Sequence, residues 1–467
     1  MLVSEDIGGV TDALLPRAIL WGSCLLVLGR IAIFAMLGPQ ALEPDTTQLV
    51  LWSSTLRECL ATGMLGACGG AGHFPLFQYL PALALGAAGF EPAAIVRALA
   101  VVSFAAFLGL LMAGWRALPA SREARALWLV VMGSGPLLFY AQSSFGEALA
   151  AFLVAAAVAS CWNRLPAPGI AALFALAGIT KEIAPPILMV LGVIAVLANE
   201  IPRARMGRSL WAVAVGSLLA VVANASFNVA RFGVPYNQIL LGPGMPLVPL
   251  SERPSFFLGL WFSPNGGLVF FWTSFVAVLA IVLAHSWRPA PAKIPAYGVA
   301  LVLAALTYGL SGWWAPFGWI AWGPRLLLPW IPACLMILLR AYPKETLVLG
   351  QLGGAARAAI FAVIAIAGLS QFSALYGLEV IQRIFGPAPG CPSIPTDPAN
   401  QAQYYFHCMR YYVWEPRIPL GRLFGAALQP PATPFALAYL VALLGWYRIA
   451  ASQRRTLARR VGITPAP

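Results

Sequence analysis

Long apolar runs follow one another along the chain, and short polar connections separate most of them. A helix that crosses a bilayer needs about 20 apolar residues. On this pattern the sequence predicts about twelve membrane spans, at residues 15–37, 93–113, 126–142, 146–162, 170–180, 183–198, 210–230, 266–284, 294–312, 324–339, 358–377 and 434–447. The expected fold class is an all-α polytopic membrane protein with about 12 transmembrane helices.

The first outer loop, residues 38–92, departs from this pattern because it is long and mixed in character. We expect a short helix from Gln48, capped by Thr46 or Thr47, because hydroxyl side chains are favoured at helix N-caps. Residues 74–89 are apolar, contain two prolines and have no flanking basic residue. They predict a helix lying on or dipping into the membrane interface rather than a span.

Composition strengthens the membrane assignment. The chain has 467 residues, of which 60% are hydrophobic and 10% charged, whereas soluble domains carry roughly 25% charged residues. The net charge of +13 does not indicate nucleic-acid binding, because the basic residues lie in short loops and the tail. The N-terminal segment has no basic region and no small-residue cleavage site, so we expect the first span to be retained.

Lys and Arg are distributed unequally between the two sides of the predicted topology. With the N-terminus inside, the inner loops and tail hold about twice as many as the outer loops, as the positive-inside rule requires. We therefore expect a multi-pass protein of the inner (plasma) membrane with both termini cytoplasmic. The first loop then faces outward.

Two carboxylates, Glu43 and Asp45, follow the first span directly on that outer side. Either could act as a base on a substrate carried by a lipid. Both could equally be solvated residues at the start of a helix.

Other ionisable residues stand at predicted outer ends of spans, within apolar sequence: Glu147, Lys181, Glu182 and Arg231. Such residues are costly in a membrane and usually pair or serve a site. Glu147 could also simply favour the first turn of its helix. Lys181 with Glu182 could be a snorkelling pair, and Arg231 an interface anchor.

Arg325 is the most informative cation, since it follows Gly-Pro at the start of a span. A guanidinium held by a rigid turn is well shaped to bind phosphate. Several tryptophans precede it, including Trp314 and Trp322. They could form an interface belt, or stack on a sugar or cover a polyprenyl chain.

The order and shared sidedness of these motifs resemble the GT-C superfamily of membrane glycosyltransferases. They are an Asp after span one, a Pro-aromatic interfacial helix, Ser-x-x-x-Glu at Glu147, Thr-Lys-Glu at Lys181, and Gly-Pro-Arg at Arg325. The likeness is greatest to bacterial members similar to protein mannosyltransferases and aminoarabinose or arabinofuranosyl transferases. It covers about residues 15–339.

The resemblance implies that a sugar moves from a polyprenyl-phosphate donor to a glycan, lipid or protein acceptor on the outer, periplasmic face, with inversion. It implies that Asp45 is the base, with Glu43 as the alternative, and that Glu147 is the second acidic residue. Arg325, with Lys181, would bind the donor phosphate. Further candidates for substrate contact are His73, Glu182, Trp314 and Trp322.

No loop shows the His/Cys/Asp spacing of a metal site, so we expect no obligatory metal or other cofactor, and no nucleic-acid partner. The partners expected are the lipid-linked donor, the acceptor and membrane lipids. The competing interpretation is a polytopic transporter or lipid-linked-sugar flippase without transferase activity.

Three regions are expected: a GT-C-like transmembrane catalytic module at 1–378, a small outer segment at 379–432, and the last transmembrane helix with a basic cytoplasmic tail at 433–467. Four cysteines fall in predicted outer loops, as the pairs Cys59 with Cys68 and Cys391 with Cys408. In an oxidising compartment each pair can form a disulfide.

Overall fold

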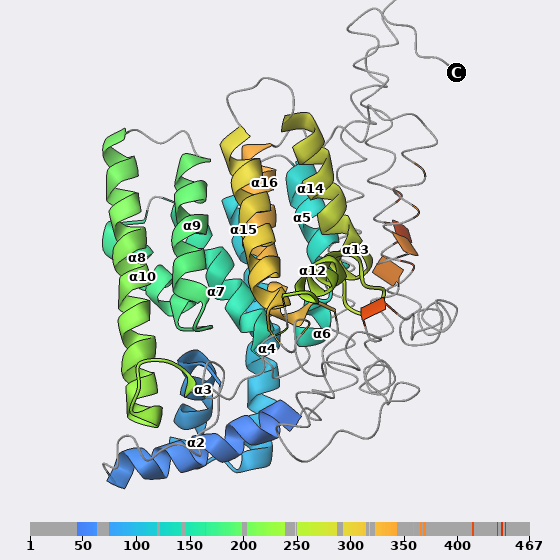
Figure 1. Cartoon of the computed structure of the whole chain (residues 1–467). Helices are drawn as coiled ribbons and strands as arrows, with labels where there is room; N and C mark the ends of the chain where they lie inside the picture. Colours follow the sequence, from blue (N-terminus) through green and yellow to red (C-terminus); the bar gives the residue numbers. More distant parts are fainter. Residues whose placement is uncertain are drawn as a thin grey trace, which may run out of the picture.

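The computed structural model describes residues 44–62, 74–118, 122–141, 146–163, 165–198, 203–238, 248, 250–286, 293–313, 317, 323–342 and scattered positions between 358 and 444. Every regular element in this part of the chain is a helix, which confirms the predicted all-α class. Figure 1 shows an upright bundle of helices with one helix lying across its lower end. The predicted span at 15–37 lies outside the described residues, as do most of those at 358–377 and 434–447.

The helices alternate in direction along the bundle and are joined by short connections (Figure 1). In chain order, the described residues form α2 (Pro44–Thr62), α3 (Leu76–Ala87), α4 (Pro92–Ala117), α5 (Arg122–Gly133), α6 (Leu137–Ala141), α7 (Glu147–Ser160), α8 (Ala167–Gly178), α9 (Ala184–Leu197), α10 (Arg203–Phe232), α12 (Arg253–Phe262), α13 (Leu268–Phe271), α14 (Thr273–Ser286), α15 (Lys293–Ser311), the short 3₁₀ helix η2 (Arg325–Leu327) and α16 (Ile331–Ala341).

Within the described residues, three helices are both long and apolar enough to cross a membrane: Pro92–Ala117, Arg205–Phe232 and Ile294–Ser311. The helices at the other predicted spans are apolar but shorter, as in α7, α8, α9 and α16. Helices α7, α8 and α9 match the predicted positions closely, whereas the span predicted at 324–339 starts with η2 and a turn, and α16 begins only at Ile331. The predicted total of twelve is not tested by the described part of the chain.

Two predicted spans are each broken into two helices, which corrects the sequence-based expectation. The span expected at 126–142 is interrupted between α5 and α6 at Ser134-Gly135-Pro136, where proline removes a backbone donor. The span expected at 266–284 is interrupted at Trp272, between α13 and α14.

The two breaks face each other. Trp272 Nε1 donates a hydrogen bond to the Val131 carbonyl at 2.9 Å, and the hydroxyl oxygens of Ser134 and Ser274 are 3.2 Å apart. Gly135 lies so close to the Trp272 indole that an added Cβ would come within 2.4 Å of it. Each broken helix therefore supplies polar partners to the other.

Helix α7 is the central helix of the bundle and packs against α4, α6, α8, α9 and α16. Its sequence, EALAAFLVAAAVAS, is rich in alanine. Small side chains let neighbouring helices approach closely where no water drives the packing. The first residue of this central helix is Glu147, so the fold places a carboxylate at the middle of the bundle's lower end.

Helix α2 lies across that lower end and packs on α3 and α4 (Figure 1). It begins at Pro44, four residues before the predicted start at Gln48, so Thr46 and Thr47 lie inside its first turns rather than capping it. Proline is favoured at a first helical position, where its missing N–H costs nothing. The stretch at 74–89 forms the short helix α3, as predicted, and its position at the membrane interface stays a prediction.

The helix ends at the other end of the bundle carry most of the basic residues of the described part. They are the ends of α4 and α5, of α9 and α10 and of α14 and α15 that face each other, and they include Arg116, Arg205 and Arg208. Arg340 lies there too, near the end of α16, and donates to the Ala117 carbonyl at 2.7 Å. The charge asymmetry predicted from the sequence is therefore an asymmetry between the two ends of one bundle.

Candidate active site

Glu147 is the centre of the most concentrated charge cluster in the described part of the chain. Its side chain is 0% exposed. The backbone enters α7 through Gly146, whose φ of +79° favours glycine. A Cβ at this position would also meet the Gln78 amide of α3 at 2.4 Å. The turn before Glu147 therefore fits only because residue 146 has no side chain.

Two cations from distant parts of the sequence reach the same carboxylate oxygen. Lys181 Nζ is 3.1 Å from Glu147 Oε1, and Arg325 Nε is 2.8 Å from it. Lys181 lies in the turn between α8 and α9, whereas Arg325 opens η2 after the Gly323-Pro324 turn. The side chains of Lys181 and Arg325 are 19% and 9% exposed, so both pairs are shielded from solvent.

The cluster has a net positive charge and one open acceptor. Two cations and one carboxylate sum to +1 if all three are ionised, which the close pairing favours. Glu147 Oε2 is buried and has no hydrogen-bond partner among the described residues. A buried carboxylate oxygen without a partner is costly, so this atom is suited to accept a hydrogen bond from a bound hydroxyl or water.

A second polar network lies beside the first, around Arg231 at the end of α10. Arg231 Nη2 donates to Asn228 Oδ1 at 2.6 Å and lies 3.5 Å from Glu182 Oε1. Asn237 Nδ2 donates to the same Glu182 oxygen at 3.0 Å. Burial raises the pKa of the Glu182 carboxyl, against the opposite effects of the Asn237 hydrogen bond and the Arg231 charge.

Arg231 also fixes helix α3. Its Nη1 donates to the Phe74 carbonyl at 2.9 Å, and its guanidinium lies over the Tyr79 ring, 5.8 Å from the centroid. Burial raises the pKa of the Tyr79 phenol to about 12, so the phenol stays neutral. The amide of Phe77 donates to the Ile179 carbonyl at 3.3 Å. The α8–α9 turn that carries Lys181 is thus held against α3.

The structure brings together three of the predicted site residues, Glu147, Lys181 and Arg325, and places Glu182 in the adjoining network. Asp45 lies in the first turn of α2, at the same end of the bundle. The candidates outside the described residues are Glu43, His73, Trp314 and Trp322. The catalytic and binding roles of all these residues stay predictions.

Sequence reasoning missed Asn228 and Asn237, which support the second network, and Gln78, which lies against the turn before Glu147. An interface anchor was one interpretation of Arg231, yet its side chain is fully buried. The one available signal was spacing, since Asn228 and Arg231 stand three residues apart and share a helix face. No sequence pattern indicated that residues of α3 and of the loop after α10 would contact Arg231 and Glu182.

The described cysteines bear on the disulfide predictions in part. Cys161 and Cys334 are free and buried, whereas Cys59 on α2 is disulfide-bonded. Cys68, the partner expected for Cys59, lies outside the described residues, as do Cys391 and Cys408. Both pairings stay predictions. No group of three or more His, Cys, Asp or Glu in the described part could hold a metal ion, and the expected absence of a metal stays a prediction as well.

Neither the models of known protein families nor the curated proteins match this sequence. Among solved structures, the chain is similar to the crystal structure of ArnT from Cupriavidus metallidurans in the apo state. The sequence identity is 18%, the TM-score is 0.43, and the alignment covers 95% of this chain and 81% of that chain. A likeness of this degree does not assign a function, which has to come from the site itself.

Proposed function

We propose that the protein is a membrane glycosyltransferase that moves a sugar from a polyprenyl-phosphate donor to an acceptor hydroxyl on the outer face of the inner membrane. The observation that carries the proposal is the meeting of Glu147, Lys181 and Arg325 at one end of a bundle of apolar helices. The net charge of +1 suits the single negative charge of a phosphodiester linking a sugar to a lipid. The apolar helices suit its hydrocarbon chain.

In the proposed reaction the acceptor oxygen attacks the anomeric carbon while the bond from that carbon to the phosphate oxygen breaks. The acceptor proton passes to a carboxylate base, for which Asp45 is our candidate, and the bonding electrons leave with the lipid phosphate. Arg325 and Lys181 stabilise the charge that develops on the departing phosphate. One displacement inverts the anomeric carbon and needs one base, unlike hydrolysis by a carboxylate pair.

Glu147 takes a supporting role in this scheme. Its carboxylate is paired with two cations, so it is a weaker proton acceptor than a solvated carboxylate. It instead orients Arg325 and Lys181 toward the donor phosphate. Its open oxygen, Oε2, is suited to accept a hydrogen bond from a sugar or acceptor hydroxyl.

A second candidate function, movement of a lipid-linked substrate across the membrane, is favoured by the two broken helices that meet at Ser134 and Ser274. Transporters place substrate sites at paired helix breaks near mid-membrane. A transporter, however, has no need for the cation cluster at the bundle end. Purified protein in liposomes separates the two functions: transfer gives a new glycoside, whereas transport only changes the side on which the labelled donor lies.

Replacing Arg325 by alanine is expected to weaken binding of a polyprenyl-phosphate sugar by at least about tenfold, the effect of losing a hydrogen bond to a charged group. Arg325→Lys should restore little, because an ammonium cannot reproduce the planar fork of a guanidinium. Scintillation proximity binding of a labelled donor to the purified protein measures both effects.

Arg340→Ala is the matched control, since Arg340 lies near the opposite end of the adjacent helix α16. It should leave donor affinity unchanged. Equal donor affinity in Arg325→Ala, Arg325→Lys and the unaltered protein would exclude the proposed phosphate contact.

A further inference from the structure

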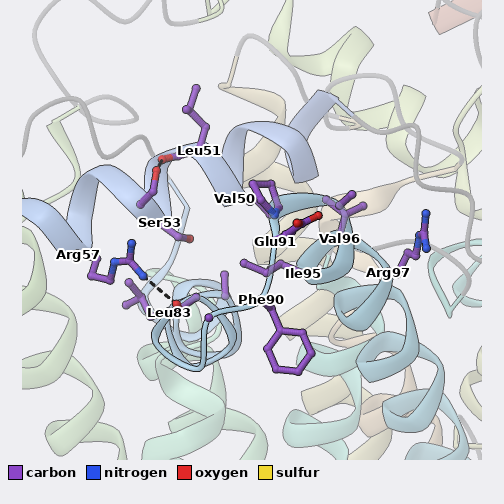
Figure 2. Close-up of a pocket in the computed structure, with 16 residues that line it drawn as sticks. Val50, Leu51, Ser53, Arg57, Leu83, Phe90, Glu91, Ile95, Val96 and Arg97 are labelled. Atoms are coloured by element: carbon purple, nitrogen blue, oxygen red, sulfur yellow. Dashed lines mark hydrogen bonds between the residues drawn. The ribbon is translucent and has the colours of Figure 1, made fainter.

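A cavity of about 790 Å³ lies between α2, α3 and α4, away from the charge cluster. Figure 2 shows α2 along one side of this groove, with α3 and the start of α4 completing it. Apolar side chains form much of its lining, among them Val50, Leu83, Ile95 and Val96. A groove of this size and character is typical of a site for an apolar or amphipathic ligand.

The charged residues of the groove favour an anion. Arg57 and Arg97 line it at opposite ends (Figure 2), and Glu91 is the one acidic residue among its lining residues. Arg57 donates to the Gly86 carbonyl at 2.8 Å, and this neutral acceptor does not neutralise the guanidinium charge. Arg97 is exposed on α4 and forms no ion pair with any other described residue.

Arg97 also begins a stripe of exposed side chains along α4, a helix long and apolar enough to span a membrane. Residues four apart share one helix face, and Arg97 is followed on its face by Val101, Ala105 and Met112. Val101 and Met112 are 53% and 50% exposed. An amphiphile with its anionic group at Arg97 would therefore find one apolar surface on α4 and a second in the groove.

We propose that this groove binds an anionic diacyl phospholipid of the surrounding bilayer, with its phosphate at Arg97, one acyl chain against α4 and the other in the groove. Two apolar surfaces that diverge from one cation fit two chains on one headgroup. A bound lipid would fix α2 and α3, the two helices nearest the bundle end, against α4. The proposal does not depend on glycosyl transfer.

Native mass spectrometry of the purified protein tests this, using phosphatidylglycerol and phosphatidylcholine with identical acyl chains. The unaltered protein should bind phosphatidylglycerol at least about fivefold more tightly, the contribution of one basic residue near a lipid surface. Arg97→Gln should abolish that preference. Ala93→Trp, which places a bulky ring at a lining position, should weaken binding of both lipids.

Arg116→Gln is the matched control, because Arg116 is also exposed on α4 but lies in its last turn. It should keep the preference for phosphatidylglycerol. The proposal is overturned if Arg97→Gln still prefers phosphatidylglycerol, if the unaltered protein shows no preference, or if Ala93→Trp binds both lipids normally.

Discussion

Replacing Glu147 by glutamine is expected to lower the free energy of unfolding by about 3–5 kcal/mol, the usual effect of removing one partner of a buried ion pair. The glutamine has nearly the same shape, so packing around α7 is preserved. It removes the carboxylate charge that pairs with both Arg325 and Lys181, although both cations are shielded from water. Denaturation in sodium dodecyl sulfate, followed by tryptophan fluorescence, measures the change.

Two variants make the result specific. Glu58→Gln removes an exposed carboxylate on α2 and should change the free energy of unfolding by no more than about 0.5 kcal/mol. Lys181→Met, added to Glu147→Gln, removes one of the two cations that Glu147 paired with and should recover part of the loss. A Glu147→Gln protein as stable as the unaltered one would show that the cluster is not electrostatically coupled.

Replacing Asp45 by asparagine should reduce sugar transfer by at least about 100-fold, the lower range for loss of a general base. Asp45 lies in the first turn of α2, where the helix dipole favours a carboxylate by only about 0.3–1 kcal/mol. We therefore expect folding and donor binding to survive, with the loss confined to turnover. Single-turnover transfer with a preloaded donor separates the two effects.

Glu58→Gln again serves as the control, because it removes a carboxylate from the same helix. It should keep normal turnover. A large loss in Glu43→Gln alone would move the base to Glu43, and near-native turnover in Asp45→Asn would exclude Asp45 from that role.

The proximity of Glu147, Lys181 and Arg325 was the most predictable part of the candidate site, because these ionisable residues stand in apolar sequence, while their roles stay predictions. Glu147, Lys181 and Arg325 are far apart in the chain, yet each was conspicuous because a charge at that depth needs a partner. The charge asymmetry of the loops then placed them at one end. Because all three residues were predicted on the same side of the membrane, they could be expected to lie near one another. The sequence pattern did not predict which cation would pair with which carboxylate.

The fold was predicted less completely, for a physical reason. On α4, buried Leu99 and Leu110 alternate with exposed Val101 and Met112, and all four are apolar. In a membrane the lipid-facing and core-facing sides are both hydrophobic, so no amphipathic pattern tells them apart. Packing partners, and the lipid groove beside α4, were therefore invisible in the sequence.

The two helix breaks were not predicted, because both lie within continuous apolar sequence. Pro136 marks the α5–α6 break, but hydropathy alone reads 126–142 as continuous. The α13–α14 break has no proline or glycine at Trp272 and depends on the indole's hydrogen bond to Val131, a tertiary contact. Likewise Arg231 and its partners on α3 are joined only by the fold.

The central claim is that the cluster of Glu147, Lys181 and Arg325 serves transfer of a sugar from a polyprenyl-phosphate donor. The most direct test incubates the purified protein in liposomes with a panel of radiolabelled polyprenyl-phosphate sugars and an extract of envelope acceptors. We predict that one labelled sugar moves to an acceptor with inverted configuration, and that Arg325→Ala reduces the rate by at least about tenfold while Arg340→Ala does not. Transfer that proceeds equally well in all three proteins, or labelled donors that cross the bilayer unchanged without any glycoside forming, would contradict the account.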